Sequence, residues 1–180
     1  SKTVWGGNFA FELLYGIYNP VNLALYFVLP AFHDLELAAT FLATAYLMIA
    51  ALGLLALGRQ VGLSRAAALL LVASVLSGNF LLYWLAASWA PAFHSFVWCV
   101  WALVFLLRCN EAASWSSLAG LTIFSAFTVS SGYPTADLML AVAVLALVAA
   151  RLWAGQGRRA LLLGLAFAAG VLLAAPALLP

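Results

Sequence analysis

Charged side chains are scarce in this sequence. Asp, Glu, Lys and Arg together make up 7% of the 180 residues, whereas an ordinary soluble domain has about 25%. Hydrophobic residues make up 68%, so this composition excludes a soluble fold. The formal net charge is only +2 and the basic residues are scattered along the chain, which argues against nucleic acid as a partner.

Alternation of apolar and polar residues is also missing. Runs such as AAALLLVASVL, residues 66–76, do not alternate, whereas the strands of a transmembrane barrel alternate over about ten residues. Instead, the apolar residues form successive runs of about 17 to 23 residues, which is the length of a membrane-spanning helix. The sequence therefore predicts an all-α fold, a polytopic transmembrane helix bundle with the lipid bilayer as a partner.

The bundle is predicted to form a single membrane domain over residues 1–180. We expect about six spans in a core that covers residues 35–176, near 35–57, 66–84, 90–107, 114–131, 135–152 and 159–176. Residues 1–34 form an outer segment, in which residues 21–29 are apolar but too few to cross a bilayer. We predict a short interfacial helix there. Because the chain starts at Ser1 and ends at Pro180 just after a span, we expect it to be a fragment of a longer protein.

Basic and acidic residues separate if these spans alternate in direction. Six of the seven Lys and Arg residues then fall on one side, namely Arg59, Arg65, Arg108, Arg151, Arg158 and Arg159. Four of the five acids fall on the other side, namely Glu12, Asp34, Glu36 and Asp137. The positive-inside rule predicts that the arginine loops are cytoplasmic and that the acidic loops are extracytoplasmic.

Ionisable side chains are missing from the middle of every predicted span. Ion-coupled transporters and proton pumps usually carry such groups at mid-depth, so we expect any chemistry in the outer, acidic loops. Glu12 is the strongest catalytic candidate there, because no span begins beside it and helix capping does not account for it.

A divalent cation is a candidate cofactor. His33, Asp34 and Glu36 could bind it beside a phosphate, since carboxylates and imidazole are suitable ligands. The alternative, which we favour, is that Asp34 and Glu36 cap the first full span and complement its helix dipole. Asp137 has the same two interpretations, because Thr135 is predicted to cap the fifth span.

Three further patterns concern packing. Residues 132–134, Gly-Tyr-Pro, predict a tight turn between the fourth and fifth spans. In the last span Ala166, Gly170 and Ala174 predict a small-residue face that lets another helix approach closely. Cys99 and Cys109 would lie about 15 Å apart on one helix, which is too far for a disulfide.

Several short motifs carry a family resemblance. They are Gly16 with Asn19-Pro20, Trp89 and Pro91 before a span that ends at Arg108, Ser131-Gly132-Tyr133-Pro134, and Ala175-Pro176 to Leu179-Pro180. Their order resembles that of the bacterial YfhO-type membrane proteins, in the GT-C superfamily of glycosyltransferases, which take sugars from polyprenyl-phosphate carriers. The family often has histidine where this chain has Tyr133.

This resemblance implies a glycosyltransferase of the bacterial inner membrane that takes part in building the cell envelope. A polyprenyl-phosphate-sugar donor would be used on the extracytoplasmic face, and the main catalytic acid is expected upstream of Ser1, in an outer loop after a first transmembrane helix. We expect the substrate to contact Asn19, Trp89, His94, Tyr133 and Asp137. Two of these residues have a simpler interpretation. Asn19 is expected to make a turn before Pro20, and His94 is expected to be a satisfied polar residue near the interface.

Two other functions remain open from the residues alone. A transporter or lipid flippase is disfavoured by the lack of charge inside the spans, although lipid translocation can use a hydrophilic groove. A non-enzymatic envelope assembly protein is the other alternative. In the full-length sequence, a preceding span and a loop acid would favour the enzyme, whereas further spans with buried charges would favour transport.

Overall fold

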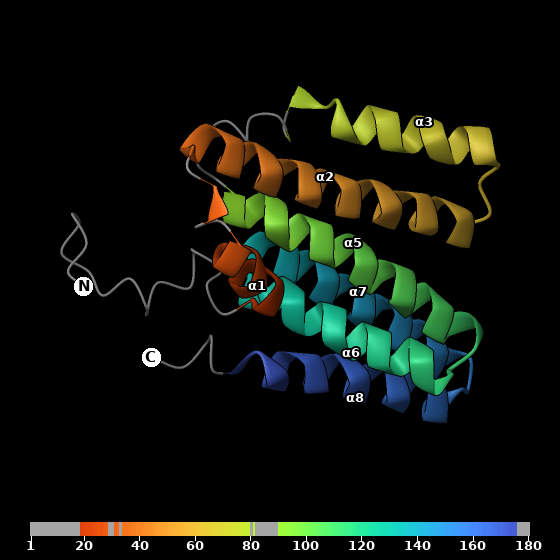
Figure 1. Ribbon diagram of the computed structural model, residues 1–180. Helices are drawn as coiled ribbons and strands as arrows, with labels where there is room; N and C mark the ends of the chain where they lie inside the picture. Colours follow the sequence, from red (N-terminus) through yellow and green to blue (C-terminus); the bar gives the residue numbers. More distant parts are fainter. Residues whose placement is uncertain (1–18, 29–30, 33, 80, 82–89, 176–180) are drawn as a thin grey trace.

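The structure, a computed structural model, describes residues 19–28, 31–32, 34–79, 81 and 90–175 (Figure 1). Within these residues all regular secondary structure is helical, which confirms the all-α prediction. The seven helices described are α1 (Pro20–Val28), α2 (Leu35–Gln60), α3 (Arg65–Leu76), α5 (Ala90–Glu111), α6 (Trp115–Ser130), α7 (Pro134–Trp153) and α8 (Gly157–Leu173).

The helices from α2 to α8 run along one common direction, and successive helices point in opposite directions (Figure 1). The short helix α1 differs, because it lies across the end of the bundle at which α2, α5 and α7 begin (Figure 1). A short helix was predicted for residues 21–29, and α1 covers Pro20–Val28. The prediction of a separate short helix before the first long one is therefore confirmed.

Helix α5 is at the centre of the bundle. Of its long apolar segment 67% is buried, compared with 28% for the segment of α2 and 17% for that of α7. Phe93, Val97, Ala102 and Val104 on α5 are completely buried, and α2, α6 and α7 pack around them. Each of these outer helices thus packs one face against α5 and leaves its other face exposed.

Those exposed faces are apolar. On α7 the exposed side chains follow a helical repeat along one face and include Leu138, Val142, Leu145 and Leu152. Contiguous apolar surface of this kind is typical of a surface that contacts lipid. Three segments are long and apolar enough to cross a membrane, namely Glu36–Gln60, Ala92–Glu111 and Pro134–Trp153. We therefore treat the chain as a membrane protein.

The predicted count of six spans is only partly matched. Each predicted range contains a helix, but three helices have the length and composition of a membrane span. In the second range, 66–84, α3 ends at Leu76, and Ser77 Oγ donates a hydrogen bond to the Ala73 carbonyl (2.7 Å). Asn79 and Leu81 are helical again, whereas residues 80 and 82–84 lie outside the described residues. The 12 residues of α3 rise about 18 Å, whereas the hydrocarbon layer is about 30 Å thick.

Helix α8 packs closely on α6 through the predicted small-residue face. Ala166, Gly170 and Ala174 are all buried. A Cβ atom at Gly170 would lie 2.6 Å from the Thr122 carbonyl oxygen, so a larger residue does not fit without a shift of one helix. Thr122 Oγ1 also donates a hydrogen bond to the Ala166 carbonyl (2.9 Å) and joins the two helices.

The tight turn predicted between α6 and α7 is confirmed. Gly132 has a φ of 81°, a conformation that favours glycine, and Pro134 is the first residue of α7. The prediction that Thr135 caps α7 is wrong. Tyr133 occupies the N-cap position and makes no side-chain capping hydrogen bond, because Pro134 already begins the helix.

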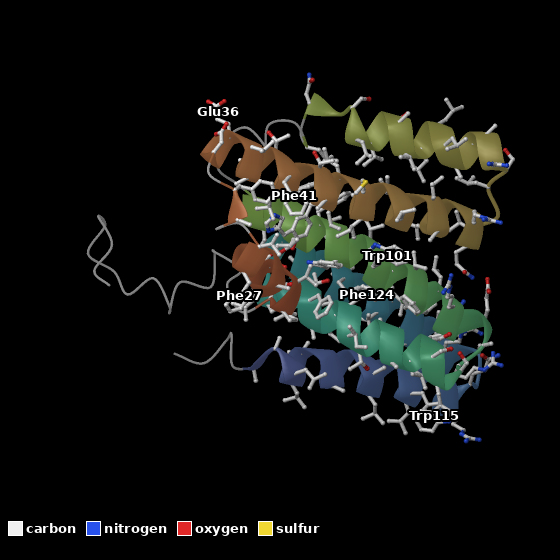
Figure 2. The ribbon with its side chains drawn as sticks, in the orientation of Figure 1. Phe27, Glu36, Phe41, Trp101, Trp115 and Phe124 are labelled. Atoms are coloured by element: carbon white, nitrogen blue, oxygen red, sulfur yellow. The ribbon has the colours of Figure 1, made fainter. Side chains whose placement is uncertain are left out.

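Charged side chains lie at the two ends of the bundle. The arginine end is the end at which α2, α5 and α7 finish, and it carries Arg59, Arg65, Arg108, Arg151, Arg158 and Arg159. The acidic end is the opposite one, and it carries Asp34, Glu36 and Asp137. Figure 2 shows the two ends through Glu36 and Trp115, which lie on opposite sides of the molecule. The fold therefore separates these charges as predicted, with Glu111 as an acid at the arginine end.

Arg151 links three segments at the arginine end through hydrogen bonds. Its Nε and Nη2 donate hydrogen bonds to Oδ1 (2.6 Å) and to the carbonyl (3.0 Å) of Asn110, in the last turn of α5. Its Nη1 donates to Oε1 of Gln156 (2.6 Å), in the turn between α7 and α8. One guanidinium thus joins α5, α7 and that turn.

Candidate functional site at the acidic end

The described candidates share one end of the bundle. Asn19, Asp34, Glu36, His94, Tyr133 and Asp137 all lie near the starts of α1, α2, α5 and α7, at the acidic end. Glu12, His33 and Trp89 lie outside the described residues. The fold thus brings candidates from four separate parts of the sequence to the same end.

Asn19 is completely buried, and both the oxygen and the nitrogen of its side-chain amide form hydrogen bonds. Its Oδ1 accepts hydrogen bonds from the backbone N–H groups of Val21 (2.9 Å) and Asn22 (3.3 Å), which caps α1. Its Nδ2 donates to the Phe127 carbonyl (2.9 Å) and to Ser131 Oγ (3.0 Å) at the end of α6. Asn19 therefore holds α1 against α6, which gives it a structural role.

A second contact joins α1 to α2. Tyr46 and Asn22 are both completely buried, and the Tyr46 hydroxyl donates a hydrogen bond to Asn22 Oδ1. The Tyr46 ring contacts three rings of α5, those of Phe93, His94 and Trp98. Tyr46 thus fixes the position of α1 relative to both α2 and α5.

His94 lies in the second turn of α5 and is 4% exposed. Its ring stacks on that of Tyr46, with 3.8 Å between the centroids and 17° between the planes. Its Nδ1 has no hydrogen-bond partner among the described residues. A buried polar atom without a partner costs about 1 to 3 kcal/mol. Within the described residues, this atom does not support the interpretation of His94 as a satisfied polar residue.

The end of α6 adds hydroxyl groups to the same region. Ser95 Oγ donates a hydrogen bond to the Thr128 carbonyl (3.4 Å), and Ser131 Oγ donates to the Phe127 carbonyl (2.8 Å). Tyr133 follows this helix and packs, partly buried, against the hydrophobic residues around α5. We call the buried polar residues of this region the polar layer: Asn19, Asn22, Tyr46, His94, Ser95, Thr128 and Ser131.

Asp137 lies in the first turn of α7, and its Oδ1 is buried without a hydrogen-bond partner among the described residues. No side chain caps α7, so Asp137 does not act as its cap, although the helix dipole favours an acid in this first turn. The preceding residue, Ala136, is held against α5 by a hydrogen bond from Cys99 Sγ to its carbonyl (3.8 Å). Asp137 is therefore the strongest acidic candidate in the described part of the chain.

Asp34 and Glu36 follow the capping interpretation. Asp34 is the N-cap residue of α2, and its carboxylate accepts a hydrogen bond from the Glu36 backbone N–H (2.8 Å). The described residues contain no group of three or more His, Cys, Asp or Glu side chains that could hold a metal ion. Because His33 is not among the described residues, the divalent cation stays a prediction.

Sequence reasoning missed Asn22 and Tyr46, the pair that joins α1 to α2. Each was visible as an isolated polar group within an apolar stretch. Asn22 lies three residues after Asn19, and Tyr46 lies in the middle of the first long apolar run. Such groups are expensive to bury alone. A search for two isolated polar residues that could pair would have found them.

The acidic end therefore combines the buried polar layer with two buried polar atoms that have no described partner, His94 Nδ1 and Asp137 Oδ1. A carboxylate can accept hydrogen bonds from hydroxyl groups, and an imidazole nitrogen can accept or donate one. Both atoms lie within two helical turns of the starts of α5 and α7. No protein-family model matches this chain, and no curated protein or solved structure shows a significant match to it.

Proposed function

We propose that this chain is the membrane core of a glycosyltransferase that takes a sugar from a polyprenyl-phosphate donor at its acidic end. The motif resemblance to the YfhO-type proteins of the GT-C superfamily suggests the reaction. The positive-inside rule predicts that the arginine end is cytoplasmic, and the resemblance suggests a bacterial inner membrane, so the proposed reaction takes place on its extracytoplasmic face.

The observation that carries this proposal is the buried carboxylate oxygen of Asp137. It neither caps a helix nor forms an ion pair within the described residues. Acids placed inside membrane domains are costly and are usually retained for function. A sugar supplies hydroxyl donors that satisfy such an oxygen, and His94 Nδ1 offers a second hydrogen-bonding atom at the same end of the bundle.

Helix α1 suits the lipid part of the donor. Its exposed side chains Leu23, Phe27 and Val28 are apolar, and Phe27 is 78% exposed. Figure 2 shows Phe27 at the acidic end. An apolar helix that lies across a membrane-facing end is typical of the interface between headgroups and acyl chains. The polyprenyl chain would lie along this surface and bring the sugar phosphate to the polar layer.

Catalysis needs a base that accepts the proton of the acceptor hydroxyl. We assign this role to an acid upstream of Ser1, with Glu12 as the second candidate, and we assign sugar binding to His94 and Asp137. This division of roles agrees with the distribution of acids in the sequence.

The test is sugar transfer by the full-length protein, with polyprenyl-phosphate sugars as donors. We expect Asp137→Asn to lower kcat/KM by about tenfold or more, which corresponds to a loss of about 1.4 kcal/mol of transition-state stabilisation. Glu111→Gln is the matched control, because Glu111 is an exposed acid at the arginine end, and its activity should stay within about twofold of the wild type.

Equal activities of the two variants at equal expression would remove Asp137 from the site. Movement of labelled donor lipid between leaflets without any sugar transfer would overturn the enzyme proposal in favour of a flippase.

A further inference from the structure

A second region with the features of a ligand site lies at the arginine end. A cavity of about 470 Å³ opens where α2 ends and α3 begins. Ligand sites in proteins typically measure about 300 to 1,000 Å³. Two cationic and four apolar side chains line this cavity, namely Leu55, Arg59, Leu63, Arg65, Ala68 and Leu69. Such a lining suits a molecule that has both an anionic group and an apolar chain.

The connection between the two helices gives the cavity a fixed shape. Gly62, with a φ of 84°, and Leu63 donate backbone hydrogen bonds to the carbonyls of Arg59 (3.1 Å) and Gly58 (2.9 Å). This pattern is a Schellman motif, which ends a helix in a defined conformation. A Cβ atom at Gly58 would lie 3.1 Å from that of Ala68, so the helices approach closely beside the cavity.

The two arginines of the cavity are available to a ligand. Arg59 and Arg65 are both exposed, and neither side chain has a hydrogen bond or ion pair within the described residues. Other arginines of the same end are engaged, since Arg108 lies over the Phe105 ring (5.1 Å) and Arg151 is hydrogen-bonded. Helix stability does not account for Arg65, because the helix dipole disfavours a cation at the first residue of α3.

Apolar surface continues from the cavity along α3. Leu63 and Leu69 are 39% and 51% exposed, and the neighbouring Leu70 is 67% exposed. In a membrane this surface contacts acyl chains, so a lipid that reaches the arginines loses little contact with the hydrocarbon layer.

We propose that this cavity binds an anionic phospholipid from the leaflet at the arginine end. The phosphate group pairs with Arg59 and Arg65, because guanidinium groups bind phosphate through paired charged hydrogen bonds. One acyl chain follows Leu63 and Leu69 towards the hydrocarbon layer. Basic pockets between membrane helices recognise lipid headgroups in this way. The site lies at the opposite end from the proposed sugar transfer and does not depend on it.

The experiment measures lipids retained by the full-length protein in native mass spectrometry. Phosphatidylglycerol is compared with phosphatidylcholine of the same acyl chains. We expect the wild type to retain phosphatidylglycerol, and Arg59→Gln with Arg65→Gln to lower its apparent affinity by about tenfold or more. The matched control is Arg158→Gln with Arg159→Gln, which removes the same charge from the same end outside the cavity and should retain the lipid.

A third variant tests the lipid chain. Leu69→Ser keeps both arginines and should weaken the binding of phosphatidylglycerol. Soluble glycerol phosphate should not compete with the lipid for any variant. Any of three results would overturn the proposal. These are an equal loss of phosphatidylglycerol affinity in the two double arginine variants, equal retention of both lipids by the wild type, and full competition by glycerol phosphate.

Discussion

Arg151 joins three segments at the arginine end with a single side chain. Its guanidinium donates to the side chain and carbonyl of Asn110 and to the side chain of Gln156. We expect Arg151→Gln to lower the free energy of unfolding by about 2 kcal/mol, because hydrogen bonds from a charged donor are lost. The melting temperature of the purified protein in detergent checks this. Arg158→Gln, at an exposed arginine of the same end, should melt close to the wild type, and equal melting of the two variants would contradict the role.

Individual polar residues could be recognised in the sequence, but their partners could not. Asn19 stood out beside Pro20, yet its amide bonds Phe127 and Ser131, which are 108 and 112 residues away. No local pattern records a contact at that separation. Asp137 was open to two interpretations because its distance from the helix start was known only within a few residues. With Pro134 as the first residue of α7, Asp137 lies in the first turn, where the helix dipole favours an acid, but its carboxylate makes no capping hydrogen bond.

The contact between α6 and α8 depends on the absence of a side chain at Gly170. A Cβ atom there would lie 2.6 Å from the Thr122 carbonyl oxygen, whereas one at Gly164 on the same helix would have no neighbour within 4 Å. We expect Gly170→Ala to lower the stability by about 1 to 3 kcal/mol, the usual cost of overpacking. Gly164→Ala should raise it by up to about 1 kcal/mol, because alanine favours helix.

Thermal unfolding of both glycine variants in the same detergent measures the difference. A higher melting temperature for Gly170→Ala than for Gly164→Ala would show that α8 does not pack on α6 as described.

Helix positions were predicted well where the apolar runs are bounded by charges or turn residues. The range 114–131 corresponds to Trp115–Ser130 and the range 135–152 to Pro134–Trp153. The range 66–84 is interrupted by the short polar sequence Ser77-Gly78-Asn79 inside a long apolar run, and its last residues lie outside those that the structure describes. Average hydropathy barely changes over three residues, although Ser77 closes α3 there. A hydropathy window therefore does not register so short a break.

The orientation of the whole bundle in the membrane is predicted by its arginines. In a variant without Cys99 and Cys109, a single cysteine at Ser64 or Gly157 should be shielded from impermeant thiol reagents in intact cells. A cysteine at Thr135 should be labelled, because it lies at the acidic end and is exposed. The native cysteines are free and buried, and the replacement of Cys99 also removes its hydrogen bond to the Ala136 carbonyl. Labelling from outside at the arginine end would reverse the orientation.

The division of charges between two ends followed from the sequence, but the central position of α5 did not. All the long runs are apolar, and hydropathy does not distinguish a helix surrounded by protein from one surrounded by lipid. What distinguishes α5 is the number of helices that pack on it, and this depends on the arrangement of the others. The polar layer escaped prediction for the same reason, because it is assembled from α1, α2, α5 and α6.

The burial of α5 also imposes an order on the synthesis of the protein. The ribosome completes α5 before α6, α7 and α8 exist, so the faces that they later cover first meet lipid. Val97, Ala102 and Val104 are apolar and tolerate this exposure. The Ser95 hydroxyl reaches its Thr128 acceptor only once α6 has been made. The nascent chain can therefore insert its early helices in sequence, but the acidic end acquires its final form only after the later ones have arrived.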